Sequence, residues 1–283
     1  MIALLSTNFF RIRRDLLFWL ALCVCLVGGI AFGMGFRGAL AFDDFYAFPF
    51  FVALCAFLSL FLGREYGDGT LRNKVTAGYR RGQIYLAYLL ASLAVGLLFL
   101  AAFLLPFVVM NAAALAPLGA KVLGPALVGM VLLCATLVAL FTAISCCVSL
   151  WVVGALVNLG LWFFLMFGAY QIEFALGQPA YVTEYYTDAQ GREYEGETTP
   201  NPHYLGETLR VVAEGVDACL PNGQMNRIVS YLTTCLSLQE TGLDPEGAEL
   251  YQEVRFRDPL CALAVTAGVT AVGLAVFRKK DLK

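Results

Sequence analysis

The chain has 283 residues, of which 60% are hydrophobic and only 14% are charged, with a formal net charge of −2. A soluble domain is typically about 45–50% apolar and about 25% charged, so this composition excludes an ordinary soluble protein and indicates an integral membrane protein. The net charge itself is uninformative because the charges are segregated along the chain, and we expect no nucleic-acid partner.

The first 15 residues are predicted to form an amphipathic helix that lies in the membrane interface. Arg11 and Arg14 would then lie near anionic lipid headgroups. Apolar residues recur at helical spacing, at Ile2, Leu5, Phe9, Ile12 and Leu16. The alternative is that these residues are a charged extension of the first transmembrane helix.

Uncharged apolar runs predict six transmembrane helices, because a bilayer core about 30 Å thick needs roughly 20 apolar residues per helix. The runs are 16–36, 45–63, 83–120, 122–172 and 259–277. The first exceeds the apolar core of a signal peptide, so an uncleaved helix is expected. The third helix should end near residues 106–111. The fourth run is too long for one span and should turn back near residues 145–149.

The distribution of Lys and Arg predicts the orientation. The N-terminus, the loop 64–82 and the C-terminus hold most of the cations, whereas the short loops on the other side hold only Arg37 and Lys121. Because cytoplasmic loops carry an excess of Lys and Arg, we expect a multi-pass protein of the plasma membrane with both termini in the cytoplasm.

The acidic segment 173–257, with fourteen Asp and Glu against five Arg, is then an external cap. It divides the chain into 1–172 (interfacial helix and spans one to five), the cap, and 258–283 (span six and tail). Its tyrosine-rich start predicts a hairpin over 181–194. Helices are predicted at 207–219, with Leu209, Val212 and Val216 on one face, at 225–238 and at 244–253.

Two cap cysteines, Cys219 and Cys235, lie near the ends of the two predicted cap helices. In an oxidising compartment a disulfide between them would join the helices; otherwise both are free thiols. The remaining cysteines fall in or beside the spans, where a small packing residue is the expected role.

The sequence lacks the groups that catalysis or ion-coupled transport requires. Its single histidine, His203, has no ligand-spaced partner, and no P-loop or hydrolase motif occurs, so we expect neither an enzyme nor a metal or other cofactor in this chain. No ionisable residue lies in the interior of a predicted span. Asn158, in the fifth span, is expected to make an interhelical hydrogen bond. Any transport would therefore draw its energy from a partner.

The loop 64–82 is predicted to contain a short amphipathic helix. Asp68 or Thr70 can cap its start, Leu71, Val75 and Tyr79 share one face, and Gly78 ends it. Its cations suit lipid phosphates or an acidic protein groove. The alternative is an ordinary positive-inside loop.

The run Glu65-x3-Gly69-Thr70-Leu71-Arg72-Asn73-Lys74-x3-Gly78-Tyr79-Arg80-Arg81 resembles permease subunits of type-2 ABC exporters, as does the basic C-terminal end, 277–283. Arg80 stands where that family often has serine. The resemblance implies two permease subunits, identical or related, and two cytoplasmic ATPase subunits that hold ATP and Mg. It assigns ATPase coupling to the helix and its flanks: Glu65, Gly69, Thr70, Leu71, Arg72, Lys74, Val75, Gly78, Arg80 and Arg81.

The interpretation is thus an all-α permease subunit of an ATP-driven exporter, with a membrane sensor or scaffold that relays an external signal as the alternative. Glu65 is expected to pair with Arg72 or Arg81. Residues that could line a substrate path at the permease interface, or simply pack, are Phe50, Phe51, Phe57, Asn158 and Trp162.

Overall fold

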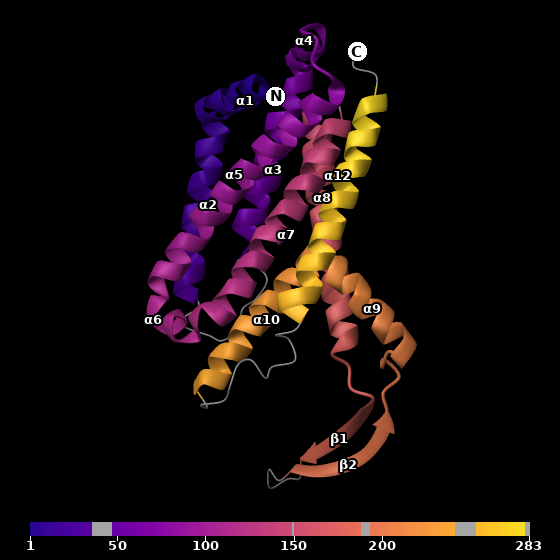
Figure 1. The fold of residues 1–283 in the computed structure, drawn as a ribbon. Coiled ribbons are helices and arrows are strands. Elements are labelled where there is room, and N and C mark those ends of the chain that lie inside the picture. The colour runs from indigo at the N-terminus through magenta and orange to yellow at the C-terminus, as the bar shows by residue number, and fades with distance from the viewer. Residues whose placement is uncertain (36–46, 149, 188–192, 241–252, 281–283) are drawn as a thin grey trace.

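The computed structural model describes residues 1–35, 47–148, 150–187, 193–240 and 253–280 (Figure 1). These residues form an elongated helix bundle with one small hairpin. Both chain termini lie at one end of the bundle, which we call the terminus-bearing end, and the hairpin extends from the other, the cap-bearing end (Figure 1).

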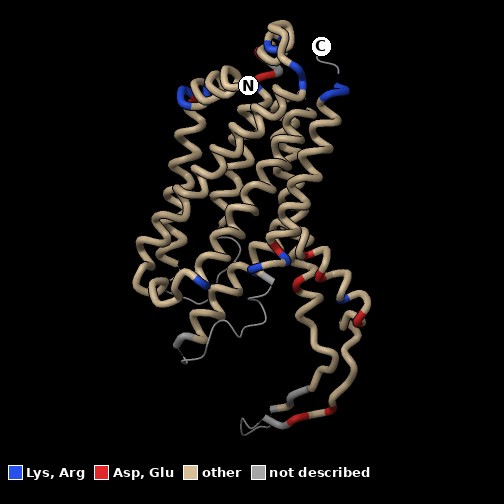
Figure 2. Tube along the Cα trace, viewed as in Figure 1, with Lys and Arg blue, Asp and Glu red and all other residues tan. Residues whose placement is uncertain are grey.

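Six helical segments of the described chain are long and apolar enough to cross a membrane. Their principal helices are α2 (Leu16–Gly35), α3 (Phe48–Gly67), α5 (Arg81–Met110), α7 (Gly119–Cys147), α8 (Trp151–Leu176) and α12 (Asp258–Lys279). Between the two ends of the bundle these helices carry no charged residues (Figure 2). The prediction of a multi-pass, all-α membrane protein is confirmed.

The predicted breaks between spans also match the structure. α5 ends at Met110, where Asn111 donates hydrogen bonds to the carbonyls of Phe107 (3.0 Å) and Gly33 (3.2 Å). A short α6 (Ala112–Leu115) and a 3-10 turn (Ala116–Leu118) lead into α7. α7 and α8 are separated only by residues 148–150, close to the predicted turn at 145–149.

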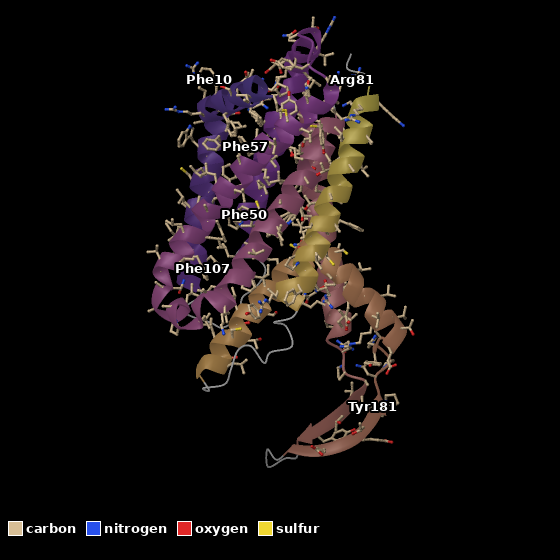
Figure 3. The ribbon with its side chains drawn as sticks, viewed as in Figure 1. Phe10, Phe50, Phe57, Arg81, Phe107 and Tyr181 are labelled. Carbon is tan, nitrogen blue, oxygen red and sulfur yellow. The ribbon has the colours of Figure 1, made fainter. Side chains whose placement is uncertain are left out.

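Small residues and aromatic rings pack the bundle. A Cβ on Gly29 of α2 would lie 2.1 Å from the carbonyl oxygen of Phe103 on α5, so glycine is needed for this close helix approach. Phe18, Phe57 and Phe99 bring rings from α2, α3 and α5 within 6 Å of one another. Phe57, Phe50 and Phe107 lie along the bundle (Figure 3) and are buried.

The cap contains the predicted hairpin and two of the predicted helices. β1 (Tyr181–Thr187) pairs antiparallel with β2 (Glu193–Pro200), and α9 (Glu207–Cys219) and α10 (Pro221–Glu240) follow. α10 begins four residues earlier than predicted. A five-residue π-helical turn, Glu253–Arg257, leads into α12. The helix predicted at 244–253 lies outside the described residues except for Glu253.

A buried ion cluster joins the cap to α12. Arg227 of α10 pairs with Asp217 of α9 and, at 2.9 Å, with Asp258 at the start of α12. Burial raises the pKa of Asp217, an effect that Arg227 opposes. The predicted apolar face of α9 is exposed: Leu209, Val212 and Val216 lie on the surface.

The two cap cysteines are both free thiols, so the structure does not contain the predicted Cys219–Cys235 disulfide. Cys235 is fully buried on α10, where its thiol is hydrogen-bonded with Tyr231. Cys219 is exposed, and its thiol is hydrogen-bonded with that of Cys261 on α12. The two side chains of the predicted pair therefore have different neighbours.

Candidate functional site

The segment between α3 and α5 forms a helical hairpin that projects at the terminus-bearing end (Figure 1). Its short helix α4 (Thr70–Thr76) lies between Gly69, with φ +66°, and Gly78, with φ +87°. Both are left-handed conformations that glycine adopts without steric cost. The predicted helix and its stop at Gly78 are confirmed. The predicted cap is wrong, because Gly69 occupies the N-cap position and no side chain caps the helix.

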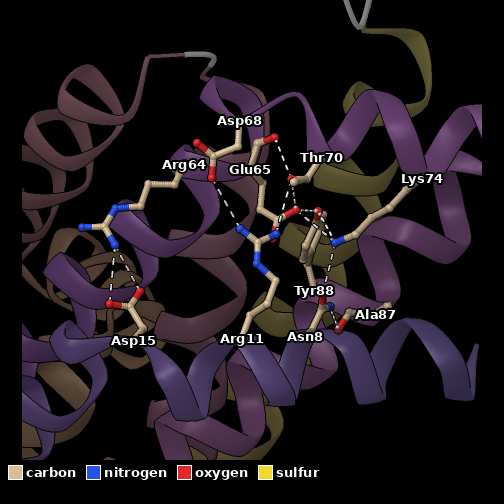
Figure 4. Close-up of polar contacts among 10 residues, drawn as sticks. All are labelled: Asn8, Arg11, Asp15, Arg64, Glu65, Asp68, Thr70, Lys74, Ala87 and Tyr88. Carbon is tan, nitrogen blue, oxygen red and sulfur yellow. Dashed lines mark hydrogen bonds and ion pairs between the residues drawn. The ribbon is translucent and has the colours of Figure 1, made fainter.

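Glu65, at the end of α3, is the centre of the polar contacts beneath α4 (Figure 4). Its side chain is only 1% exposed. The carboxylate pairs with Arg11 and with Lys74, the latter at 3.0 Å. It also accepts hydrogen bonds from the hydroxyls of Thr70 (2.6 Å) and Tyr88 (2.7 Å).

The predicted pairing of Glu65 with Arg72 or Arg81 is therefore wrong. Arg72 is exposed on α4. Arg81 instead donates to the carbonyls of Arg278 (3.0 Å) and Lys280 (2.6 Å), which lie at the end of α12. Of the two observed cationic partners of Glu65, Lys74 is nine residues away, whereas Arg11 is 54 residues away and could not be assigned from local spacing.

Lys74 is the second centre of this cluster. Its ammonium donates to Glu65, to the side-chain oxygen of Asn8 (3.1 Å) and to the hydroxyl of Tyr88 (2.9 Å). Burial lowers the pKa of Lys74 from its ordinary value, and the charge of Glu65 offsets only part of this effect. The three donor protons of the ammonium thus have three partners, from α1 (Ile2–Arg14), α3 and α5.

A more exposed layer of charges surrounds this core. Arg11 also reaches Asp68 at 3.6 Å, and Arg64 pairs with Asp15 at 3.2 Å. Asp15 additionally accepts the backbone N–H of Leu17 at 3.0 Å in the first turn of α2. These contacts join the corner between α1 and α2 to the end of α3.

We call Asn8, Arg11, Glu65, Thr70, Lys74 and Tyr88 the Glu65 cluster. It connects α1, α3, α4 and α5 through one buried carboxylate. Removing one partner of a buried ion pair typically costs about 3–5 kcal/mol, because it leaves a buried charge uncompensated. The four helices should therefore move as one unit at this end of the bundle.

The sequence-predicted coupling residues lie on two faces. Glu65, Thr70, Leu71 and Lys74 face the bundle, and Leu71 is only 3% exposed. Val75 is half-buried and packs against the core, whereas the predicted Arg72 is exposed on the outer face, as are its neighbours Asn73 and Thr76. Sequence reasoning missed Asn8, Arg11 and Tyr88 as partners of Glu65, although Asn8 and Arg11 share one face of α1 at i and i+3.

The residues predicted for a substrate path lie inside this single chain. Phe50, Phe51, Phe57 and Trp162 are each less than 5% exposed, and Phe50 and Phe51 border an apolar cavity of only about 20 Å³. Asn158 donates to Ser59 of α3 (2.7 Å) and Ser145 of α7 (2.9 Å). The predicted interhelical hydrogen bond of Asn158 is confirmed.

Within the described ranges, no group of three His, Cys, Asp or Glu residues is placed to hold a metal ion. Comparison of the chain with protein-family models, curated proteins and solved structures finds no match.

Proposed function

We propose that this chain is the permease subunit of an ATP-driven exporter, in which a separate cytoplasmic ATPase supplies the energy. The observation that supports it best is the Glu65 cluster. It fastens a short, projecting helix to three other helices through a buried carboxylate, while leaving that helix's outer face exposed.

This arrangement suits the transmission of force. A partner that presses or rotates the outer face of α4 displaces Lys74 and Thr70, which hold Glu65 of α3 and Tyr88 of α5. Because the Glu65 carboxylate is buried and has four partners, moving α4 alone would break several charge-assisted hydrogen bonds. Moving α3, α5 and α1 with it keeps them, so the motion passes into the bundle.

The energy source belongs to the partner in this proposal. The chain has no P-loop, and the interiors of its spans lack the ionisable groups that proton- or ion-coupled transporters use. The resemblance to type-2 ABC permeases adds a cytoplasmic ATPase with ATP and Mg and a second permease subunit. With both termini cytoplasmic, α4 faces that ATPase.

The substrate path is proposed to lie between two permease subunits. The core aromatics Phe50, Phe51, Phe57 and Trp162 then act mainly by packing, because each is buried within one chain. A path between subunits would be lined by residues exposed on the single chain.

Purification of the full-length chain from its native membrane, followed by identification of co-purifying ATPases, tests the proposal. We expect a stoichiometric complex whose ATPase activity rises with the permease present. Arg72→Glu, on the outer face of α4, should abolish both. Arg13→Glu is the matched control, since Arg13 is exposed at the same end but on α1, and it should leave both unchanged.

Two results would contradict the proposal. If the chain purifies with no ATPase, the proposal is wrong. If Arg72→Glu and Arg13→Glu disturb the complex equally, α4 is not the docking helix. Ligand binding to the isolated cap, transmitted to a partner without ATPase activity, would instead favour a sensor.

A further inference from the structure

A second basic feature lies at the terminus-bearing end, apart from the Glu65 cluster. Arg80, Arg81 and Arg278 line an open groove of about 470 Å³ between the start of α5 and the end of α12, together with Gly82, Gln83 and Leu86. The resemblance had assigned Arg80 and Arg81 to ATPase coupling, but neither takes part in the Glu65 cluster.

The groove is built by the backbone as well as by its side chains. Arg81 is half-buried and holds the end of α12 through the carbonyls of Arg278 and Lys280. The guanidinium of Arg278 lies against Gly82: a Cβ there would be 3.1 Å from its terminal nitrogen. A side chain at 82 would require that guanidinium to shift by a few tenths of an ångström, so glycine at 82 lets Arg278 lie close against the start of α5.

The charges of the groove are not neutralised by the protein that the structure describes. No ion pair within those residues involves Arg80, Arg81 or Arg278, whereas Arg11, Arg64 and Lys74 of the neighbouring site are all paired with carboxylates. Gln83 accepts the backbone N–H of Arg80 at 3.2 Å, which leaves its amide nitrogen as a further donor. Arginines that line one groove without a carboxylate are suited to a phosphate group, whose oxygens accept the forked hydrogen bonds of a guanidinium.

The groove lies at the start of α5, one of the helices that could span a membrane. Leu86 lies in its wall, and Leu90 and Leu97 follow on the same face of α5 at i+4 and i+11; they are 44% and 36% exposed. A ligand with a phosphate in the groove would therefore have an apolar strip beside it toward the bilayer centre. That combination of a phosphate and an apolar tail is the chemistry of a phospholipid.

We infer that this groove binds the phosphate of an anionic phospholipid headgroup, with an acyl chain along Leu86, Leu90 and Leu97. With the proposed orientation the site faces the cytoplasmic leaflet, where anionic lipids concentrate. The lipid holds α5 and α12 together at this end and supplements the contacts of Arg81. This assignment divides the cations of the terminus-bearing end into two groups. Those of the Glu65 cluster position α4, and those that line the groove bind lipid.

Native mass spectrometry of the full-length protein in detergent tests this site, with phosphatidylglycerol and phosphatidylcholine of identical acyl chains as probes. We expect phosphatidylglycerol to be retained and phosphatidylcholine to be lost. Arg80→Gln and Arg278→Gln should each weaken the retention about five-fold, and about 25-fold together. Arg72→Gln, which removes an exposed cation outside the groove, should have no effect.

Competition measurements distinguish a phospholipid from a free phosphate compound as the ligand. Inorganic phosphate or glycerol phosphate at millimolar concentration should fail to displace the lipid, because neither contacts the leucine strip. Displacement by either would show a free-phosphate site and overturn the assignment to lipid. Equal retention of both lipids, or an effect of Arg72→Gln as large as that of Arg278→Gln, would overturn it as well.

Arginines could instead bind an acidic protein surface. The same variants distinguish a protein ligand from a lipid. If Arg80→Gln with Arg278→Gln removes the ATPase from the purified complex but leaves lipid retention unchanged, the groove is a protein docking site and the inference is wrong. Unfolding temperatures of the variants in the same detergent should match that of the wild type, since both substituted side chains are exposed.

Discussion

At the scale of single residues, the ion pair of Glu65 and Lys74 is the central polar contact beneath α4. Both side chains are nearly buried, at 1% and 11% exposure, and they pair with each other at 3.0 Å. Charged groups at such a position are stable only as a pair. Neutralising one should therefore cost more than neutralising both.

A double-mutant cycle tests this coupling. Lys74→Met should lower the free energy of unfolding by about 3–5 kcal/mol, because it leaves Arg11 as the only cationic partner of the buried Glu65 carboxylate. Glu65→Gln in the same chain should recover part of that loss. The measurement is thermal unfolding of the single and double variants in one detergent, combined as a cycle.

Arg72→Met is the control for this cycle. It removes a cation from the same helix, but Arg72 is exposed on α4, so its effect should stay within about 0.5 kcal/mol. If the losses from Lys74→Met and Glu65→Gln simply add, the two residues do not act as a pair, and the Glu65 cluster would not join the helices as described.

At the scale of elements, local periodicity in the sequence predicted the secondary structure correctly. The spans, the hairpin over 181–194 and the helix at 207–219 all rest on local patterns of apolar and turn residues, and all are present. Partners of charged and sulfur-bearing side chains depend on how distant elements pack. The sequence pairs Glu65 with Arg72 or Arg81 and Cys219 with Cys235, whereas in the structure Glu65 pairs with Lys74 and the distant Arg11, and Cys219 contacts Cys261.

The contact between α9 and α12 leads to a prediction about the cysteines. Because the thiol of Cys219 is hydrogen-bonded with that of Cys261, mild oxidation should join these two. Diamide accepts the two electrons and two protons that the thiols lose as the sulfur–sulfur bond forms. Peptide mass mapping under non-reducing conditions should find the 219–261 linkage, in the wild type and in Cys235→Ser, but not in Cys219→Ser. A 219–235 linkage would mean that α9 and α10 are arranged differently in solution.

At the scale of the whole molecule, the charge distribution separates two ends of different character. Cations from α1, α4, α5 and α12 gather at the terminus-bearing end, and acidic residues are prominent in the cap (Figure 2). The proposed function and the lipid site both require the first end to be cytoplasmic. We propose that orientation because short basic loops tend to remain inside.

Thiol labelling of intact cells with a membrane-impermeant maleimide tests the orientation directly. In a Cys219→Ser background, which removes the exposed cap thiol, Val211→Cys places a new one on α9, where Val211 is 69% exposed. Thr76→Cys places its counterpart on the exposed face of α4. We expect Val211→Cys to be labelled in intact cells and Thr76→Cys only after permeabilisation. The Cys219→Ser chain without a new cysteine measures the labelling of the remaining thiols. Labelling of Thr76→Cys in intact cells would place α4 outside, where neither ATP nor an ATPase is present, and the permease proposal would fall with it.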